Sequence, residues 1–228
     1  MNTFTLTAIV GLGLALSASS ATAASLNTSG TWTNTEPALS ISGEGTNTIS
    51  WGTGGTSSYV FEGVSTTVEI DDLIDTPFLL GQFTHNNFPI FPPSLESATL
   101  NIDFSLDSFN QTFSFDFTHF ETPNSDTPCA AGGVQPCPDL VSFPNEGSSQ
   151  LITLDGIDYN FTLIGFSQNG PDNAVNEFLT LENQTNTADL FAKLTEVQEV
   201  ETVPEPAGLL GILALGGGIV TLKRKRGN

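Results

Sequence analysis

Alternation of apolar and polar residues constrains the fold of this chain more than any other feature. In residues 98–106 and 111–117, apolar side chains, several of them Phe, occupy every second position. Residues 157–163 repeat the pattern. Successive side chains of a β-strand point to opposite faces, so each segment has one apolar and one polar face. Strands that are packed on one side and solvated on the other are typical of antiparallel sheets.

Further strands are predicted where short apolar or β-branched runs lie between turn residues. These runs are residues 48–51, 58–62, 66–71, 78–84, 140–143, 151–154 and 177–182, with 188–197 interpreted as a last strand rather than a short helix. Asp155-Gly156 predicts a tight hairpin. No segment of the domain shows sustained 3.6-residue periodicity. The fold is therefore predicted to be all-β, an antiparallel two-sheet sandwich of jelly-roll type.

The first residues are typical of a secretory signal peptide. Residues 9–16 are apolar, and Ala21-Thr22-Ala23 has the Ala-x-Ala form of a cleavage site. The segment before the apolar run contains no Lys or Arg, so the α-amino group supplies its positive charge. We expect residues 1–23 to be removed during export.

The C-terminal segment combines a Pro-Glu-Pro box, an apolar run and a basic cluster. The box is Val203, Pro204, Glu205 and Pro206, and the cluster is Lys223, Arg224, Lys225 and Arg226. The apolar run between them is predicted to form a single short membrane helix, with the basic residues held on the cytoplasmic side. Residues 198–203 are predicted to be an acidic linker between this segment, residues 204–228, and the domain.

The predicted domain, residues 25–197, is strongly acidic. The chain has 25 Asp and Glu against five Lys and Arg, and Lys193 is the one base that precedes the basic cluster. Such a field repels nucleic acid and anionic lipid surfaces. We therefore expect no nucleic-acid partner.

Cys129 and Cys137 lie in a Gly/Pro-rich segment of a chain that is predicted to leave the cytoplasm. We expect them to form a disulfide that closes a small surface loop. A metal site would need further Cys or His nearby, which this stretch lacks.

His85 and His119 are the two histidines of the chain, and each follows a predicted strand. On one interpretation they meet at one end of the sandwich with Glu121 and bind a metal. On the interpretation that we favour, each ring bonds a backbone carbonyl and fixes a corner, and the nearby Asn86, Asn87 and Asn124 satisfy turn backbones.

Two acidic sets are alternative candidates for a structural calcium ion. They are Asp71, Asp72 and Asp75, and Asp155 with Asp158. Their oxygen ligands suit calcium, but no Asp-x-Asp-x-Asp-Gly loop is present. No other cofactor is expected.

Catalytic motifs are absent from the sequence. It contains no Gly-x-Ser-x-Gly, His-Glu-x-x-His or phosphate-binding Gly loop, so we expect the protein not to be an enzyme. Trp32, Trp51 and Tyr59 are interpreted as core or sheet-edge aromatics rather than as sugar-stacking rings.

The middle of the chain resembles the Thr-His-x-Asn type of PEP-CTERM protein, also called the choice-of-anchor K domain. The motif residues are Thr84, His85, Asn87, His119, Glu121 and Asn124, with further likeness at residues 30–32, 49–52 and 165–166. This resemblance spans nearly the whole predicted domain. It implies a secreted or surface-anchored β-domain with no established biochemical activity.

The C-terminal segment resembles the PEP-CTERM sorting tail of Gram-negative bacteria. This resemblance implies that an exosortase, a membrane transpeptidase, recognises Pro204-Glu205-Pro206 and cuts near it. The protein would be held briefly at the inner membrane and then reach the cell surface or the extracellular matrix, in association with exopolysaccharide and biofilm. The alternatives are a secreted carbohydrate-binding or carbohydrate-active domain and a calcium-dependent adhesin.

Overall fold

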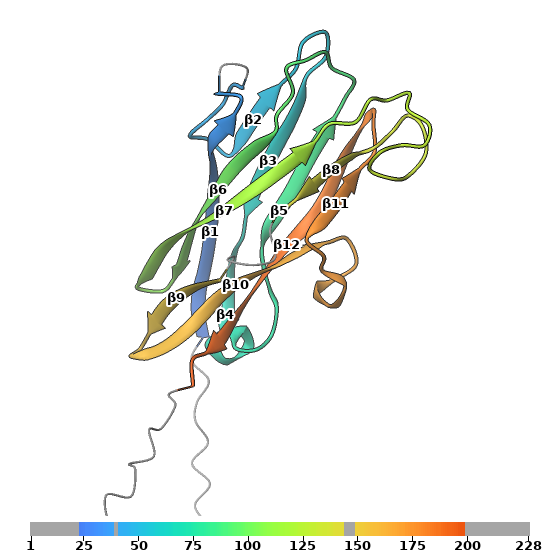
Figure 1. Ribbon diagram of the computed structural model, residues 1–228. Helices are drawn as coiled ribbons and strands as arrows, with labels where there is room; N and C mark the ends of the chain where they lie inside the picture. The colour runs from blue at the N-terminus through green and yellow to red at the C-terminus, as the bar shows by residue number, and fades with distance from the viewer. Residues whose placement is uncertain (1–22, 39–40, 144–148, 199–228) are drawn as a thin grey trace, which may run out of the picture. The chain divides into compact units, whose positions relative to one another are not determined.

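The computed structural model describes residues 23–38, 41–143 and 149–198, which form twelve β-strands in two sheets of six (Figure 1). The described residues belong almost entirely to the compact unit that ends at Val197. All ladders between the named strands are antiparallel. The predicted all-β, two-sheet antiparallel architecture is therefore confirmed.

The first sheet has the strand order β11-β8-β7-β6-β1-β4. Its strands are β1 (Ala23–Glu36), β4 (Ser65–Glu69), β6 (Ser97–Leu106), β7 (Phe109–Phe120), β8 (Asp139–Ser142) and β11 (Glu177–Thr180). The long central strands β1, β6 and β7 carry most of its inward-facing surface.

The second sheet has the strand order β2-β3-β5-β12-β10-β9. Its strands are β2 (Thr48–Trp51), β3 (Ser57–Gly63), β5 (Phe78–Asn87), β9 (Ser149–Leu154), β10 (Ile157–Ser167) and β12 (Gln184–Glu196). Two short 3-10 helices, η2 (Ile70–Leu73) and η3 (Pro171–Asn173), lie in connections.

Aromatic side chains fill the space between the sheets. The ring of Phe161 on β10 stacks on that of Phe113 on β7, with ring centroids 3.8 Å apart, and meets Phe104 of β6 edge-on at 5.4 Å. Trp32 on β1 packs against Tyr59 on β3 with centroids 5.5 Å apart. Since these pairs join strands of opposite sheets, the aromatic layer is what holds the two sheets face to face.

The predicted strands are confirmed, with differences at their ends. The segment 66–71 was expected to be extended throughout, but the strand ends at Glu69 and η2 follows. The last strand begins at Gln184, earlier than expected. The Asp155-Gly156 hairpin joins β9 to β10, and both residues have positive φ values, of 50° and 85°, as a type I′ turn requires.

The sequence pattern missed β1, which is the longest strand. Its inward-facing positions include Thr28 and Gly30, so the apolar alternation that marks the other strands is interrupted. Gly30 is required there because a Cβ atom would lie 2.4 Å from the ring of Phe61 on the opposite sheet. At Gly81 of the neighbouring strand β5, a Cβ atom would lie 2.5 Å from the same ring and 2.5 Å from the carbonyl oxygen of Glu62. Close packing of the two backbones around one aromatic side chain therefore replaces apolar side chains at these positions.

The ends of the chain that carry the sorting predictions lie outside the described residues. This holds for residues 1–22 of the predicted signal peptide, for most of the 198–203 linker and for the predicted membrane helix. Across the part of the chain that is described, no helix is long and apolar enough to cross a bilayer.

We expect Phe161→Ala to lower the free energy of unfolding by about 3–5 kcal/mol, because it removes a ring that contacts both sheets and leaves a cavity. Leu151→Ala on the neighbouring strand β9 is the matched control. Leu151 is 62% exposed whereas Phe161 is fully buried, so the control should cost less than about 1 kcal/mol. Urea unfolding of the two variants measures the difference, and equal losses would contradict the role assigned to the aromatic layer.

Candidate functional site

A group of buried polar side chains lies between the sheets, at the end where β5 and β7 finish. We call it the buried cluster, and its members are His85, His119, Glu121, Asp139 and Glu182. His85 comes from β5 in the second sheet, His119 from β7 and Asp139 from β8 in the first. Glu121 directly follows β7, and Glu182 lies between β11 and β12.

His85 sits inside a strand rather than in the loop that the sequence suggested. Strand β5 continues to Asn87, and His85 pairs with Tyr59 of β3 on one side and with Asn186 of β12 on the other. Because side chains alternate along a strand, His85 and Asn87 point to the same inward face, and both are fully buried. The Thr-His-x-Asn spacing therefore places the imidazole and an amide side by side between the sheets.

The hydrogen bonds of His85 indicate which of its ring nitrogens carries the proton. Its Nδ1 lies 2.8 Å from the hydroxyl oxygen of Thr180, and that hydroxyl lies 3.2 Å from the carbonyl oxygen of Asp139, to which it donates. With its single proton directed to that carbonyl oxygen, the hydroxyl accepts a hydrogen bond from Nδ1–H of His85, and this is the tautomer that we assign. Burial, followed by the proximity of His119, holds the pKa of His85 well below its ordinary value. His85 is thus a neutral imidazole whose Nε2 carries a free lone pair, and Nε2 has no hydrogen-bond partner.

His119 connects the aromatic core to the carboxylates. Its Nδ1 shares a 2.6 Å hydrogen bond with the hydroxyl of Tyr59, and its Nε2 lies 3.3 Å from Oε2 of Glu121 and 3.9 Å from Oδ2 of Asp139. The rings of His85 and His119 meet edge to face, with centroids 5.2 Å apart. Burial, with the nearby charges of Asp139 and Glu121, raises the pKa of Tyr59 well above its usual range, so the phenol keeps its proton.

The loop that precedes β8 delivers Asp139 to the cluster. One carboxylate oxygen, Oδ1, accepts a hydrogen bond of 2.8 Å from the backbone N–H of Thr122. The hydroxyl of Thr122 lies 3.2 Å from the carbonyl oxygen of Cys137 and 3.0 Å from that of Pro138. Cys137 forms the predicted disulfide with Cys129, with an S–S distance of 2.04 Å. The disulfide loop thus fixes the chain two residues before Asp139, whose second oxygen, Oδ2, is buried without a partner.

Two further carboxylates complete the cluster. Oε2 of Glu121 accepts a hydrogen bond of 2.9 Å from the hydroxyl of Ser94. The side-chain amide nitrogen of Asn124 donates hydrogen bonds to Oε1 of Glu182 at 3.0 Å and to the carbonyl oxygen of Cys137 at 3.1 Å. Oε2 of Glu182 is buried and has no partner. The cluster therefore has three atoms without a hydrogen bond, one each on His85, Asp139 and Glu182.

Burial, together with neighbouring negative charge, shifts the titration of Asp139 and Glu182. Burial raises the pKa of Asp139 to about 6, and the charge of Glu121 adds to the rise. Burial raises the pKa of Glu182 to about 7, and the charges of Asp139 and Glu121 add to it. Lys193 is the sole Lys or Arg among the described residues, and it forms no ion pair with the cluster. Compensation of the negative charge must therefore come from protons or from a cation.

The cluster has the spacing of a metal site. His85, His119 and Asp139 each offer one ligand atom, and these atoms lie within 4.8 Å of one another. Glu121, Asp139 and Glu182 form a second such set, which shares Asp139 with the first. Thr180 is fully buried and its hydroxyl proton is directed to a carbonyl, so the Thr180–His85 pair is not arranged as a nucleophile and its base.

Solvent reaches the cluster from one side. A hollow of about 410 Å³ is lined by Pro37, Pro92, Pro93, Ser94, Leu95, Glu96, His119, Phe120 and Glu121. The side chain of Glu121 is 22% exposed, whereas those of His119 and Asp139 are fully covered. Glu121 thus lies at the boundary between the hollow and the buried members of the cluster.

His119 lies next to both His85 and Glu121, but the group of ligand atoms that contains the two histidines includes Asp139 in place of Glu121. The favoured interpretation, in which each ring bonds a backbone carbonyl, is wrong, because both rings bond side chains. Asn86 and Asn87 lie within β5 rather than in a turn.

Sequence reasoning missed Asp139 and Glu182. Both belong to a chain that is acidic throughout, so nothing in their neighbourhood marks them as buried. The one available signal for Asp139 was its position just after Cys137-Pro138, where a disulfide loop ends and a strand begins.

The other candidate residues are placed as follows. Trp32 and Trp51 are buried in the core, as expected, so neither ring is available at the surface for stacking on sugar. Asp71, Asp72 and Asp75 do not belong to any group of three metal-ligand atoms within the described residues. Asp158 accepts a hydrogen bond of 2.7 Å from Thr153.

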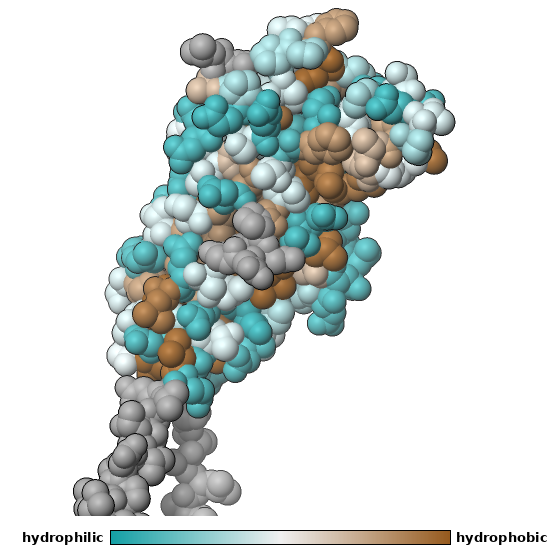
Figure 2. Space-filling model, in the orientation of Figure 1, coloured by the Kyte–Doolittle hydropathy of each residue, from teal (hydrophilic) through white to brown (hydrophobic). Residues whose placement is uncertain are grey.

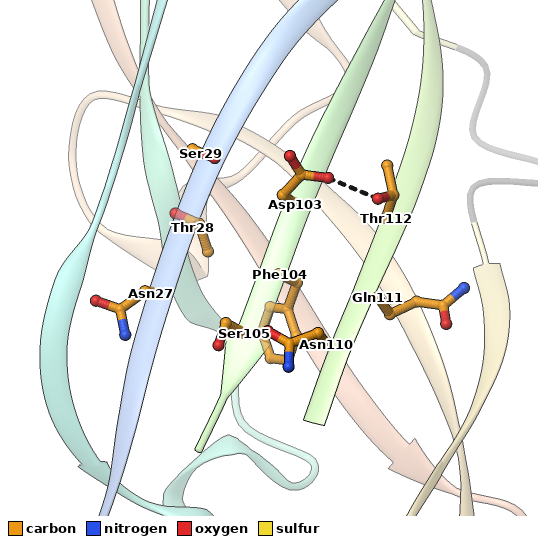
Figure 3. A pocket seen from close by; sticks show the side chains of 9 residues that line it. All are labelled: Asn27, Thr28, Ser29, Asp103, Phe104, Ser105, Asn110, Gln111 and Thr112. Carbon is orange, nitrogen blue, oxygen red and sulfur yellow. Dashed lines mark hydrogen bonds between the residues drawn. The ribbon is translucent and has the colours of Figure 1, made fainter. Parts of the chain in front are cut away.

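A second hollow of about 410 Å³ lies over β1, β6 and β7 (Figure 3). Polar residue types predominate in its wall, although more of the surface is apolar than polar, and the lining residues are Asn27, Thr28, Ser29, Asp103, Phe104, Ser105, Asn110, Gln111 and Thr112. Asp103 is the one carboxylate in this wall and accepts a hydrogen bond of 2.6 Å from Thr112. The wall therefore lacks the pair of carboxylates that glycoside hydrolysis uses.

The face of the domain shown in Figure 2 is mostly hydrophilic, with hydrophobic side chains near β8 and β11 and again near β9. No protein-family model matches this chain, and no curated protein matches it either.

We expect the metal-free protein to be less stable at pH 8 than at pH 5, by about 1–2 kcal/mol. The folded state raises the pKa values of Asp139 and Glu182, so between about pH 4 and pH 7 it binds more protons than the unfolded state does. The stability that these protons contribute is complete below the unfolded pKa values and is lost as pH rises through the folded ones. Urea unfolding of chelator-treated protein across this range measures the slope.

Glu182→Gln separates this effect from the general repulsion of an acidic surface. The amide stays neutral, so part of the loss between pH 5 and pH 8 should disappear in this variant. The control is Glu177→Gln, which removes an exposed carboxylate from β11 and should leave the slope unchanged. The assignment is wrong if the two variants have the same slope.

Proposed function

We propose that this chain is an exported, non-enzymatic protein of the cell surface or extracellular matrix, sorted through its PEP-CTERM-like tail by an exosortase-type enzyme. The observation that carries the proposal is the order of features in the last 26 residues: the box Val203-Pro204-Glu205-Pro206, an apolar run, and the basic residues 223–226. In this scheme the apolar run holds the protein in the inner membrane until the box is recognised. The domain then reaches the surface or the exopolysaccharide matrix.

The limits of the fold are compatible with trimming at both ends. Strand β1 begins at Ala23, where Ala23 pairs with Glu69, and β12 ends at Glu196. Removal of residues 1–23 and cleavage near Pro204 would cost the sandwich a single terminal residue. The Cys129–Cys137 disulfide supports an oxidising compartment, because such bonds are rare in cytosolic proteins.

The position of the buried cluster also suits a protein that is held by its C-terminal end. Strand β12 passes His85 at Asn186 and continues to Glu196, roughly 33 Å farther at the rise of an antiparallel strand. The last described residues and the cluster therefore lie at opposite ends of the domain. A tether at the C-terminus would leave the end that carries the cluster accessible to the surroundings.

A carbohydrate-binding domain on the same scaffold is the second candidate. The hollow in Figure 3 favours it, since amide, hydroxyl and carboxylate groups such as those of Asn110 and Asp103 can bond sugar hydroxyls. Binding of polysaccharide to the wild type but not to Asp103→Ala would support this candidate.

Intact-mass measurement of the native protein from envelope and extracellular fractions tests the sorting proposal. We expect a species that lacks both the signal segment and residues after the Pro-Glu-Pro box, with its two cysteines oxidised. Pro204→Ala combined with Pro206→Ala should leave the C-terminus uncut and shift the protein to the inner-membrane fraction. Thr202→Ala, just outside the box, should be processed normally. Recovery of an uncut wild-type chain from the cytosol would refute the proposal.

A further inference from the structure

The buried cluster holds more acceptor atoms than hydrogen-bond donors. Nε2 of His85, Oδ2 of Asp139 and Oε2 of Glu182 are buried without partners, and their residues are 0%, 0% and 7% exposed. Buried acceptors are normally satisfied, because removing a lone pair from water without replacing its partner is costly. His85 and Asp139 belong to one group of neighbouring ligand atoms, so a cation bound between them would satisfy the free atoms of both.

We propose that His85, His119 and Asp139 bind one divalent transition-metal ion of the zinc class, through Nε2 of each imidazole and Oδ2 of the carboxylate. The inference concerns the domain itself and is independent of how the protein is sorted. Nε2 of His119 and Oδ2 of Asp139 are 3.9 Å apart, and each of the three residues offers a ligand atom that lies within 4.8 Å of the other two. Ligand atoms of a tetrahedral zinc are about 3.4 Å apart, so small side-chain movements complete the site.

His85 is already in the form that binds metal. Its Nδ1 proton is held by the hydroxyl oxygen of Thr180, which is in turn held by its bond to the Asp139 carbonyl oxygen. Metal-binding histidines typically donate their second ring N–H in this way, which fixes both the tautomer and the ring direction. Stacking of the ring on Trp51, with centroids 5.6 Å apart and planes 26° from parallel, fixes the direction further.

His119 is supported in the same manner from the other sheet. Its Nδ1 lies against the Tyr59 hydroxyl, which can accept a hydrogen bond as well as donate one. When Nε2 binds a metal, Nδ1 carries the ring proton and donates a hydrogen bond to the hydroxyl oxygen of Tyr59. Before binding, Nε2 faces Oε2 of Glu121 at 3.3 Å, so Glu121 holds the ring in place for the ion.

The donor set determines the class of metal. Two imidazoles with a carboxylate suit zinc and its first-row neighbours, whereas calcium and magnesium take oxygen ligands. Glu121 or Glu182 can supply a fourth oxygen, since both belong with Asp139 to the second set of ligand atoms. The hollow beside Glu121 gives the ion a route to the site from solvent.

Bound metal would join the two sheets. His85 belongs to β5 of one sheet, and His119 and Asp139 belong to β7 and β8 of the other. An ion that binds only the folded arrangement stabilises it in proportion to the logarithm of the free metal concentration. At a free zinc concentration about a hundred times the Kd, we expect Tm to rise by roughly 5–10 °C.

The chain contains only two histidines, so NMR of the ring nitrogens tests the proposal without any substitution. Full-length ¹⁵N-labelled protein is purified from exporting cells without a polyhistidine tag and treated with chelator. One equivalent of Zn²⁺ should shift the Nε2 resonances of both His85 and His119, and further Zn²⁺ should cause no additional shift. Ca²⁺ at the same concentration should shift neither. If Zn²⁺ leaves either ring unaffected, the proposed coordination is wrong.

Equilibrium dialysis with metal analysis tests the ligands individually. The wild type should bind one Zn²⁺ per chain, and Asp139→Asn and His85→Gln should each weaken binding at least about tenfold. The matched control is Glu177→Gln, which removes an exposed carboxylate from β11 and should bind zinc as the wild type does. Near-ultraviolet circular dichroism confirms that each variant is folded. Unchanged zinc affinity in a folded Asp139→Asn variant would overturn the assignment, and the NMR result decides it if that variant does not fold.

Discussion

Contact between aromatic rings across the two sheets is the interaction on which the rest of this structure depends. Phe161 meets Phe113 and Phe104 from the opposite sheet, and Tyr59 meets Trp32 in the same way. Burial of apolar area is the main favourable term in folding, and large rings supply more of it per residue than other side chains do. The sandwich is thus stabilised mainly by the packing of its interior, while its outer faces carry acidic and hydroxyl groups.

The buried cluster occupies the end of this aromatic layer, and its chemistry follows from that position. Trp51 packs against both imidazoles, and Tyr59 bonds His119 while contacting His85. These rings exclude water and lower the local dielectric, which makes uncompensated carboxylates costly. The raised pKa values of Asp139 and Glu182 and the free lone pair on His85 are consequences of one cause, the placement of acceptors in a dry site.

The disulfide loop serves this site as well as closing the chain on itself. Cys137 is fixed two residues before Asp139, and its carbonyl oxygen lies within hydrogen-bond distance of the hydroxyl of Thr122. Thr122 in turn donates its backbone N–H to Asp139, and Asn124 connects the same carbonyl to Glu182. A covalent link in a Gly/Pro-rich segment, where no long strand could hold the backbone, therefore positions two of the three carboxylates.

Most of the fold was accessible from the sequence, because alternation with a period of two is a local property of each strand. It identified residues 98–106 and 111–117 as strands with one buried face. The turn residues Asp155-Gly156 likewise predicted a hairpin, which the structure places in the second sheet. It failed at β1, where Gly30 takes an inward position because the ring of Phe61 fills the space from the opposite sheet, and where the inward-facing hydroxyl of Thr28 bonds the carbonyl oxygen of Leu80. No local pattern records a partner that comes from another sheet.

The sequence by itself determined the all-β class, the cysteine pair and the two histidines as unusual residues in an acidic chain. The tertiary structure alone decided which carboxylates meet those histidines. Asp139 and Glu182 are far from His85 along the chain, and in composition they resemble the many solvated acids around them. Their burial depends on the disulfide loop and on the β11–β12 connection reaching the same end of the sandwich, which only the packing of the two sheets defines.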